Sequence, residues 1–238
     1  MNSSLSTKLR EGTKKAHTMA ENVGFVRCFL KGVVEKNSYR KLVGSFYYVY
    51  SEMEDQMRKH QDHPILSQVY YPVLNRQRSL EQDLRFYYGD SWKQKIEISP
   101  ATQVYLERIR QVSEEKPELL IAHSYTRYLG DLSGGQILQG IAQRALNLSE
   151  GEGTAFYTFE EIPDEKQFKV AYRSQLDALP LNEELQDLIV DEANAAFDLN
   201  MKLFQELEGN LLKAIGQVLF NTLTRRRTSG STELAPTK

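Results

Sequence analysis

The chain has 238 residues, a net charge of -2, 40% hydrophobic residues and 26% charged residues, which is ordinary for a globular protein with a sizeable core. This charge balance argues against a nucleic-acid-binding protein, which normally gathers a strong basic excess on one face. The 14 glycines and 7 prolines are too few for the closely spaced turns of an all-β sandwich or barrel. The composition therefore favours one compact all-α domain.

The single cysteine and the absence of long apolar segments bear on the cellular compartment. Cys28 has no disulfide partner and lies in the apolar run FVRCFL, so we expect a buried, reduced thiol. The segment MNSSLSTKLREGTKKAHT lacks the apolar core of a signal peptide, and no stretch approaches the length of a membrane span. We therefore expect a soluble cytoplasmic protein without a membrane span.

Three helical segments are predicted near the start of the chain. Leu5, Leu9, Ala16 and Ala20 keep helical spacing, so a first helix carries His17, and serine and threonine residues upstream can cap it. Residues 25–34 form a short helix or a turn-linked apolar segment. A long amphipathic helix over 38–60 is predicted from the spacing of its apolar side chains, Leu42, Phe46, Val49, Met53 and Met57.

The rest of the chain carries further helix start and stop signals. After an irregular connection through Pro64 and Pro72, a helix over 79–88 is expected to end at Gly89. Further helices are expected to begin at Ser99 and Pro100, at Pro117, after Asp164 and after Asn182, with the last running to about Leu207 and a loop over 151–164. We thus predict six to eight helices in a domain over 1–224, followed by a disordered tail over 225–238.

Glycines interrupt the predicted helix that follows Pro117. Gly130, Gly134, Gly135 and Gly140 each cost about 1 kcal/mol relative to alanine inside a helix. Gly130 and Gly134 are four residues apart and therefore share one face, where the missing side chains allow close approach. Either another helix packs closely there, or a flat group does.

Histidine is the strongest candidate ligand for a metal. His17 can ligate heme iron, with Glu21 orienting the ring, or can form an ordinary surface pair with Glu21. His60 and His63 fit a solvated helix end, and His123 fits a core histidine. A di-iron site is disfavoured because no histidine has a glutamate three residues before it. A thiolate-ligated heme would need Cys28, which its apolar surroundings disfavour.

The segment AHSYTRYLGDLSGGQ, residues 122–136, closely resembles the distal-helix signature of heme oxygenases. LREGTKKAHTMAEN resembles the proximal helix of the same family, and SLEQDLRFYYG and QFKVAYRSQL also resemble family segments. The resemblance extends from about Leu5 to about Leu212. It implies a single-domain multi-helix bundle in which heme b, both cofactor and substrate, lies between the proximal and distal helices.

The resemblance also implies roles for individual residues. His17 would be the axial ligand to iron, while Gly130, Gly134 and Gly135 would let the distal helix press its backbone against the heme. Propionate-binding positions match Arg10, Lys169 and Arg173, with Tyr125 adding a hydroxyl donor and Lys14 assisting. Apolar pocket walls match Phe29, Phe197 and Phe204.

Catalysis is assigned to Asp131, because a carboxylate can anchor waters that deliver a proton to bound dioxygen. The resemblance implies that a hydrogen-bonded water network extends from it through Tyr50, Tyr105, Arg127 and Asn200. The products would be biliverdin, carbon monoxide and ferrous iron. Dioxygen would be the oxidant and ferredoxin the electron donor, as in photosynthetic members that supply phycobilin biosynthesis.

Two departures and two rival functions complete the interpretation. Arg10 stands where many relatives carry lysine, which keeps the charge but changes the hydrogen-bond geometry. The C-terminal sequence RRRTSGSTELAPTK is not the membrane helix of microsomal relatives, which indicates a soluble form. The rivals are a non-catalytic heme binder, which would not need Asp131, and a protein of the same architecture that binds another small molecule.

Overall fold

A computed structural model describes residues 4–228 and, within them, the side chains up to residue 208. Nine α-helices and five short 3-10 helices, with no strand, make up the described part of the chain. The α-helices are α1 (Leu5–Gly12), α2 (Lys14–Glu21), α3 (Gly24–Leu30), α4 (Lys36–Lys59), α5 (Gln77–Tyr88), α6 (Pro100–Glu115), α7 (Leu120–Leu146), α8 (Glu165–Ala178) and α9 (Glu183–Thr228). The 3-10 helices are η1 (Leu66–Gln68), η2 (Pro72–Leu74), η3 (Trp92–Gln94), η4 (Pro117–Leu119) and η5 (Ala155–Tyr157). The predicted all-α fold is confirmed.

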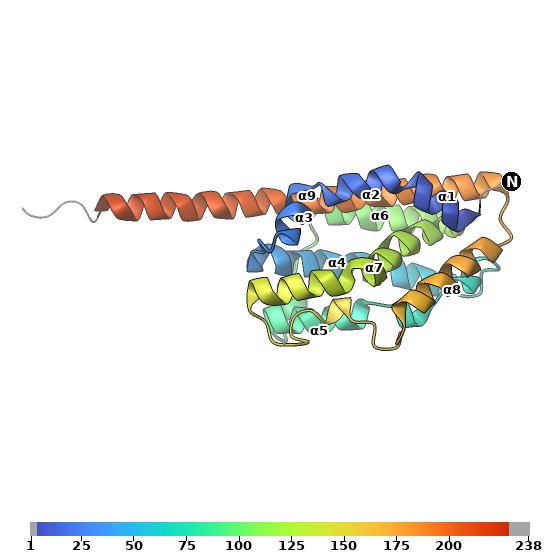
Figure 1. The fold of residues 1–238 in the computed structure, drawn as a ribbon, viewed down its shortest axis with the longest axis horizontal. Helices are drawn as coiled ribbons and strands as arrows, with labels where there is room; N and C mark the ends of the chain where they lie inside the picture. The colour runs from blue at the N-terminus through green and yellow to red at the C-terminus, as the bar shows by residue number, and fades with distance from the viewer. Residues whose placement is uncertain (1–3, 229–238) are drawn as a thin grey trace, which may run out of the picture.

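Helix α9 is the element around which the bundle is arranged. It contacts α1, α2, α3, α4, α6 and α7. Figure 1 shows α1, α2 and α3 lying along it, while α4 and α7 cross the middle of the molecule and α5 lies at the bottom of the view, opposite α9. The C-terminal part of α9 extends away from the bundle (Figure 1). Between residues 4 and 228, no helix is both long and apolar enough to span a membrane.

Three of the predicted helix starts have the expected side-chain caps. The Ser99 hydroxyl accepts a hydrogen bond from the Thr102 amide at 3.3 Å, and the Asp164 carboxylate accepts one from the Gln167 amide at 2.9 Å. The Asn182 side-chain oxygen accepts from the Leu185 amide at 2.8 Å. These contacts satisfy amides that have no partner inside the first helical turn. These three predictions are confirmed, whereas the predicted cap of the first helix is wrong, because Ser4 at the start of α1 forms no side-chain cap hydrogen bond.

The first predicted helix is in fact two helices, separated at Thr13. The Thr13 side chain is 5% exposed, and its hydroxyl donates to the Leu9 carbonyl at 2.7 Å. Such a bond to the carbonyl four residues earlier competes with the helical pattern and bends the chain. The periodicity of Leu5, Leu9 and Ala16 continues through this bend, so apolar spacing alone did not reveal it.

Other boundaries also differ from the prediction. Helix α9 continues to Thr228 instead of ending near Leu207, since no proline interrupts the sequence beyond Leu207 until Pro236. Of the predicted tail, residues 225–228 belong to α9, and 229–238 lie outside the described residues. The loop over 151–164 contains η5. Cys28 is half-buried and not fully buried, because it lies between the buried positions Phe25 and Phe29 on short helix α3.

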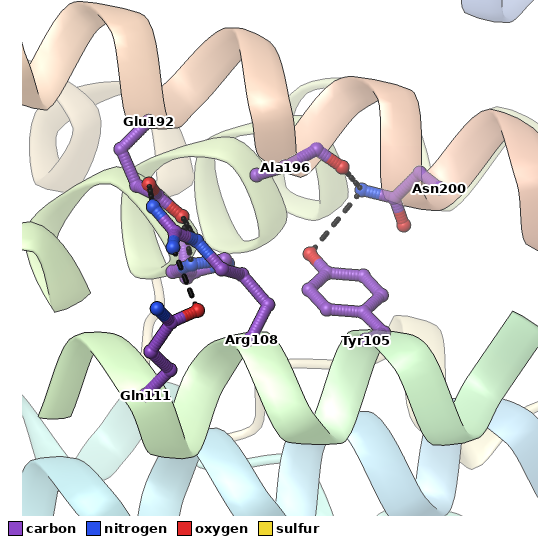
Figure 2. A network of polar contacts seen from close by, with 7 residues as sticks. Tyr105, Arg108, Gln111, Glu192, Ala196 and Asn200 are labelled. Carbon is purple, nitrogen blue, oxygen red and sulfur yellow. Dashed lines mark hydrogen bonds and ion pairs between the residues drawn. The ribbon is translucent and has the colours of Figure 1, made fainter. Parts of the chain in front are cut away.

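A buried ionic cluster joins three helices of the bundle (Figure 2). Glu192 on α9 is 3% exposed and binds the Arg108 guanidinium of α6, with one contact, from Nε, of 3.0 Å. His123 on α7 is fully buried, with Nε2 2.9 Å from Glu192 Oε1, which confirms the predicted core histidine. Burial raises the pKa of Glu192, but the hydrogen bonds from His123 and Arg108 outweigh it and hold that pKa below its ordinary value.

Glu192→Gln is therefore expected to lower the free energy of unfolding by about 2–3 kcal/mol at pH 7, at or below the lower limit of about 3 kcal/mol for breaking a fully buried ion pair, because the Arg108 side chain is 34% exposed. Because the folded-state pKa is depressed, the stabilisation is complete above the ordinary pKa of about 4.3 and is lost as the pH falls through the folded value. Urea unfolding at pH 7 and pH 3.5 measures this difference. An equal effect at both pH values would contradict the assignment.

Candidate functional site

Two adjoining cavities form a cleft lined by α2 and α7, and they share His17, Glu21, Thr126, Gly130 and Phe197. The apolar cavity has a volume of ≈ 200 Å³, and the cationic cavity has one of ≈ 750 Å³. Six phenylalanines wall the apolar cavity: Phe25, Phe29, Phe46, Phe156, Phe197 and Phe204. The cationic cavity is lined by three basic residues: Arg10, Lys14 and Arg173. Glu11 and Glu21 also line it, and Arg10 Nε lies 3.0 Å from Glu11 Oε1, so the cleft pairs an apolar end with one that carries three basic and two acidic side chains.

His17 presents its ring to this cleft from α2. Its side chain is 56% exposed, with Nδ1 3.7 Å from Glu21 Oε1. The centres of the His17 and Phe197 rings lie 5.8 Å apart in an edge-to-face arrangement. Glu21 also lines both cavities, so the exposed His17–Glu21 pair forms part of the cleft wall. An accessible imidazole beside a carboxylate is suited to binding a metal centre.

The two glycines on the facing wall have no protein neighbour that requires them. A Cβ placed on Gly130 or Gly134 meets no atom within 4 Å, although both residues line the cleft. Gly135 differs, because its Cβ would make ordinary contact with Tyr157 at 3.6 Å. Close helix packing therefore does not explain Gly130 and Gly134. Their bare backbone faces the cleft and leaves room for a flat group.

A continuous hydrogen-bonded chain borders the apolar cavity and contains all five predicted network residues. The Tyr50 hydroxyl of α4 donates to the Asp131 carboxylate of α7 and accepts from Arg127 Nε at 2.9 Å. Arg127 Nη1 also donates to Asn200 Oδ1 at 2.5 Å. The Asn200 amide nitrogen reaches the Tyr105 hydroxyl at 3.4 Å, as Figure 2 shows. Four helices thus contribute one polar chain inside an apolar wall.

Burial shifts the pKa values of the titratable groups in this series of hydrogen-bonded side chains, which we call the Asp131 chain. Burial raises the pKa of Asp131 above its ordinary value, even though Arg127 and the Tyr50 hydrogen bond oppose the shift. Burial also raises the pKa of Tyr50 far above its ordinary value, so its hydroxyl remains a donor. Although burial disfavours a cation, Tyr50 and Asp131 raise the pKa of Arg127. The arrangement combines a fixed cation with a carboxyl group that holds its proton more readily than usual.

The predicted anion-binding residues do not all lie together. Arg10 and Arg173 line the cationic cavity beside Tyr125. Burial raises the pKa of Tyr125 above its ordinary value, and the charges of the two arginines oppose part of this shift. Lys169 instead donates from Nζ to the Leu132 carbonyl at 3.0 Å and to the Ser133 hydroxyl at 3.3 Å. The structure therefore places Lys169 against the backbone of α7 and outside the lining of the cleft.

Several cleft residues were not predicted from the sequence. Phe25, Phe46 and Phe156 resemble ordinary core aromatics, and no local pattern sets them apart. Thr126 lies four residues before Gly130 and eight before Gly134, so helical spacing could have placed it on the same face. It is 9% exposed, and its hydroxyl oxygen has no hydrogen-bond partner within the described residues.

Comparison with known proteins identifies the family. The family model described as heme oxygenase matches residues 3–206. A Nostoc protein named heme oxygenase 1 is 67% identical over 235 residues, covering 99% of each chain. The crystal structure of heme oxygenase-1 from Synechocystis in complex with heme has a TM-score of 0.89 and 64% identity, covering 93% of this chain and 100% of that one. The heme oxygenase structure from Leptospira interrogans has a TM-score of 0.82 and 47% identity, covering 86% of this chain and 100% of its own. The chain belongs to the heme oxygenase family.

Proposed function

We propose that the protein cleaves heme b oxidatively to biliverdin, with release of carbon monoxide and ferrous iron, and that heme is both its cofactor and its substrate. The Asp131 chain, bordering a cleft that also presents His17, carries this proposal. A protein that only stores heme needs a ligand and an apolar pocket. Oxidative cleavage also needs protons at the reacting face, and a half-buried carboxyl group with a raised pKa is suited to supply them.

The residues of the cleft fit heme as a ligand. Heme is a flat apolar ring with two carboxylates, and the cleft joins phenylalanine walls to the cationic end at Arg10 and Arg173. Gly130 and Gly134 leave the face of the ring accessible to α7. Crystal structures of two Synechocystis relatives contain heme, which supports the same ligand here.

We assign roles within this site as follows. His17 holds the iron through a ring nitrogen, and Glu21 orients the imidazole. Arg10, Arg173 and Tyr125 bind the propionates, and Lys169 joins them through the third N–H of its ammonium, since Leu132 and Ser133 accept two. Phe204 belongs to the apolar wall, where it stacks on Phe25 with centroids 6.2 Å apart.

Bound heme supplies an iron centre at which dioxygen is activated. On the α7 side of the cleft, Asp131 holds water and a transferable proton, and the Tyr50 hydroxyl fixes the orientation of the carboxylate. Arg127 keeps a positive charge against both groups and is itself held over the Phe46 ring at 4.4 Å. The reaction consumes electrons, for which we propose ferredoxin as donor and the cytoplasm as location, in keeping with the cyanobacterial relatives.

An absorption time course tests the proposed function. The purified protein is mixed with stoichiometric heme, oxygenated buffer and a reduced ferredoxin system, and the Soret and biliverdin bands are followed. Loss of the Soret band with formation of biliverdin and carbon monoxide is the expected result. A stable histidine-ligated heme spectrum would favour a heme binder, and failure to bind heme would contradict the assignment of the ligand.

Gly130→Ala and Gly134→Ala are expected to stabilise the heme-free protein while weakening heme binding. Each added methyl group meets no protein atom within 4 Å, so alanine raises the free energy of unfolding by up to about 1 kcal/mol through helix propensity. The same methyl groups project into the proposed heme site. Thermal melts without heme and heme titrations measure the two effects.

Gly135→Ala is the matched control, because it adds the same methyl group one residue along α7 in ordinary contact with Tyr157. It should leave heme affinity unchanged. Equal loss of affinity in Gly134→Ala and Gly135→Ala would indicate a general effect on α7 and not contact with the ligand.

A further inference from the structure

The segment 155–158, which includes η5, supplies part of the apolar wall of the cleft. Phe156 and Tyr157 line the apolar cavity, and neither lines the cationic one. The Phe156 ring lies 5.3 Å from the Tyr50 ring and 5.4 Å from the Phe46 ring. The position of this segment therefore affects both the shape of the apolar end and the packing of a residue in the Asp131 chain.

Asp83 of α5 holds this segment from its amide side. The residue has no exposed surface, and its two carboxylate oxygens accept from the Ala155 amide at 2.8 Å and the Phe156 amide at 2.9 Å. Burial raises the pKa of Asp83 to about 6, so at neutral pH the group is a carboxylate. Its negative charge is stabilised by two backbone N–H groups, that of Phe156 itself and that of the preceding residue.

Arg76 holds the same segment from its carbonyl side. It is 6% exposed, and its guanidinium donates to the Thr158 carbonyl at 2.7 Å and the Leu74 carbonyl at 2.9 Å. The guanidinium also lies 3.8 Å from the centre of the Phe159 ring. Within the described residues it forms no ion pair within 4 Å, so backbone oxygens and an aromatic face make its direct contacts, while the more distant carboxylates of Asp131 and Glu54 also stabilise the charge.

Two buried charges of opposite sign are thus bound to one short stretch of backbone instead of to each other. Removing charges from water is costly, and direct pairing is the usual compensation. Here the anion binds amides and the cation binds carbonyls, so the segment is fixed from both sides. Such an arrangement restricts the position of Phe156 more strongly than the apolar contacts of its ring alone.

We infer that Asp83, together with Arg76, is a positioning residue that fixes the Phe156 wall and thereby helps select which carbon of the bound ring is cleaved. This inference rests on the proposed function. A ring anchored at the cationic end by its carboxylates has its opposite edge against the apolar end, where Phe156 lies. A displaced wall lets the ring shift in its plane relative to the Asp131 chain, so a different bridging carbon comes nearest.

The isomer composition of biliverdin from Asp83→Asn tests this inference, with Phe156→Leu as a second variant that alters the wall directly. Both variants should bind heme within about threefold of the wild-type affinity yet form at least twice the wild-type fraction of minor isomers. Chromatography of the extracted product gives the composition, and a heme titration gives the affinity. Loss of general stability alone would lower the yield of product without changing its isomer ratio.

Glu35→Gln is the matched control. The Glu35 carboxylate also accepts two backbone amides, from Asn37 at 2.8 Å and Ser38 at 2.7 Å, but at the start of α4 and outside the cleft lining. It should retain the wild-type isomer ratio.

The outcomes separate the two proposals. A wild-type protein that forms no biliverdin contradicts the proposed function, and the inference fails with it. Wild-type activity with an unchanged isomer ratio in Asp83→Asn and Phe156→Leu contradicts the inference alone. If Asp83→Asn does not fold, Phe156→Leu decides, because an unchanged ratio in that variant rules out control by the wall.

Discussion

Replacing Asp131 by asparagine is expected to reduce biliverdin formation at least 100-fold while leaving heme binding within a few-fold of wild type. Proton transfer by a positioned side chain is worth about 10²–10⁴-fold in rate, and asparagine has no proton to exchange in the relevant range. The substitution keeps the volume of the side chain and an oxygen that can accept from the Tyr50 hydroxyl. The geometry of the Asp131 chain should therefore survive while its chemistry is lost.

The measurement is single-turnover conversion of the heme complex, with the Soret band and product recorded together. Asp90→Asn, which alters an exposed carboxylate in the turn after α5, is a suitable control and should behave as wild type. Retention of wild-type biliverdin formation by Asp131→Asn would contradict a proton-handling role for Asp131. Loss of heme binding would instead indicate that Asp131 acts mainly in the structure of the cleft.

His17→Ala is expected to weaken heme binding by at least about 100-fold and to remove the spectrum of a histidine-ligated heme. Loss of groups that merely orient a metal ligand costs 10–100-fold in affinity, so loss of the ligand itself should cost at least the upper value. Because the His17 side chain is 56% exposed, the heme-free variant should keep a melting temperature close to that of wild type.

Heme titration and the position of the Soret band measure this effect. His60→Ala is the matched control, since His60 lies at the end of α4, outside both cavities, with Nε2 2.9 Å from the Ser113 hydroxyl. It should bind heme as wild type does. A His17→Ala variant with an unchanged heme spectrum would show that another residue ligates the iron.

The features predicted from sequence were those governed by local chemistry or by a long motif. Ser99, Asp164 and Asn182 were found because a short polar side chain satisfies amides only two or three residues away. The residues of the Asp131 chain were found only through the family resemblance. Their individual types carry no signal, because Tyr50 and Arg127 are 77 residues apart in the chain.

Other features depend on tertiary contacts and could not be predicted in this way. The hold of Asp83 on Phe156 spans 73 residues, and a lone aspartate within α5 looks like part of a solvated face. The bend at Thr13 was hidden because the apolar spacing continues across it. Lys169 matched a propionate position by resemblance, but its contacts with the Leu132 carbonyl and the Ser133 hydroxyl of α7 could not be predicted from the sequence.

The bend at Thr13 has a thermodynamic consequence for the wall that carries His17. It leaves α2 with only eight residues and no side-chain cap, below the length of about 12–15 residues at which isolated helices become even marginally stable in water. The order of α2 therefore comes from its packing against α9. A substitution that loosens this packing is therefore expected to disorder the wall that carries His17 without altering the imidazole itself.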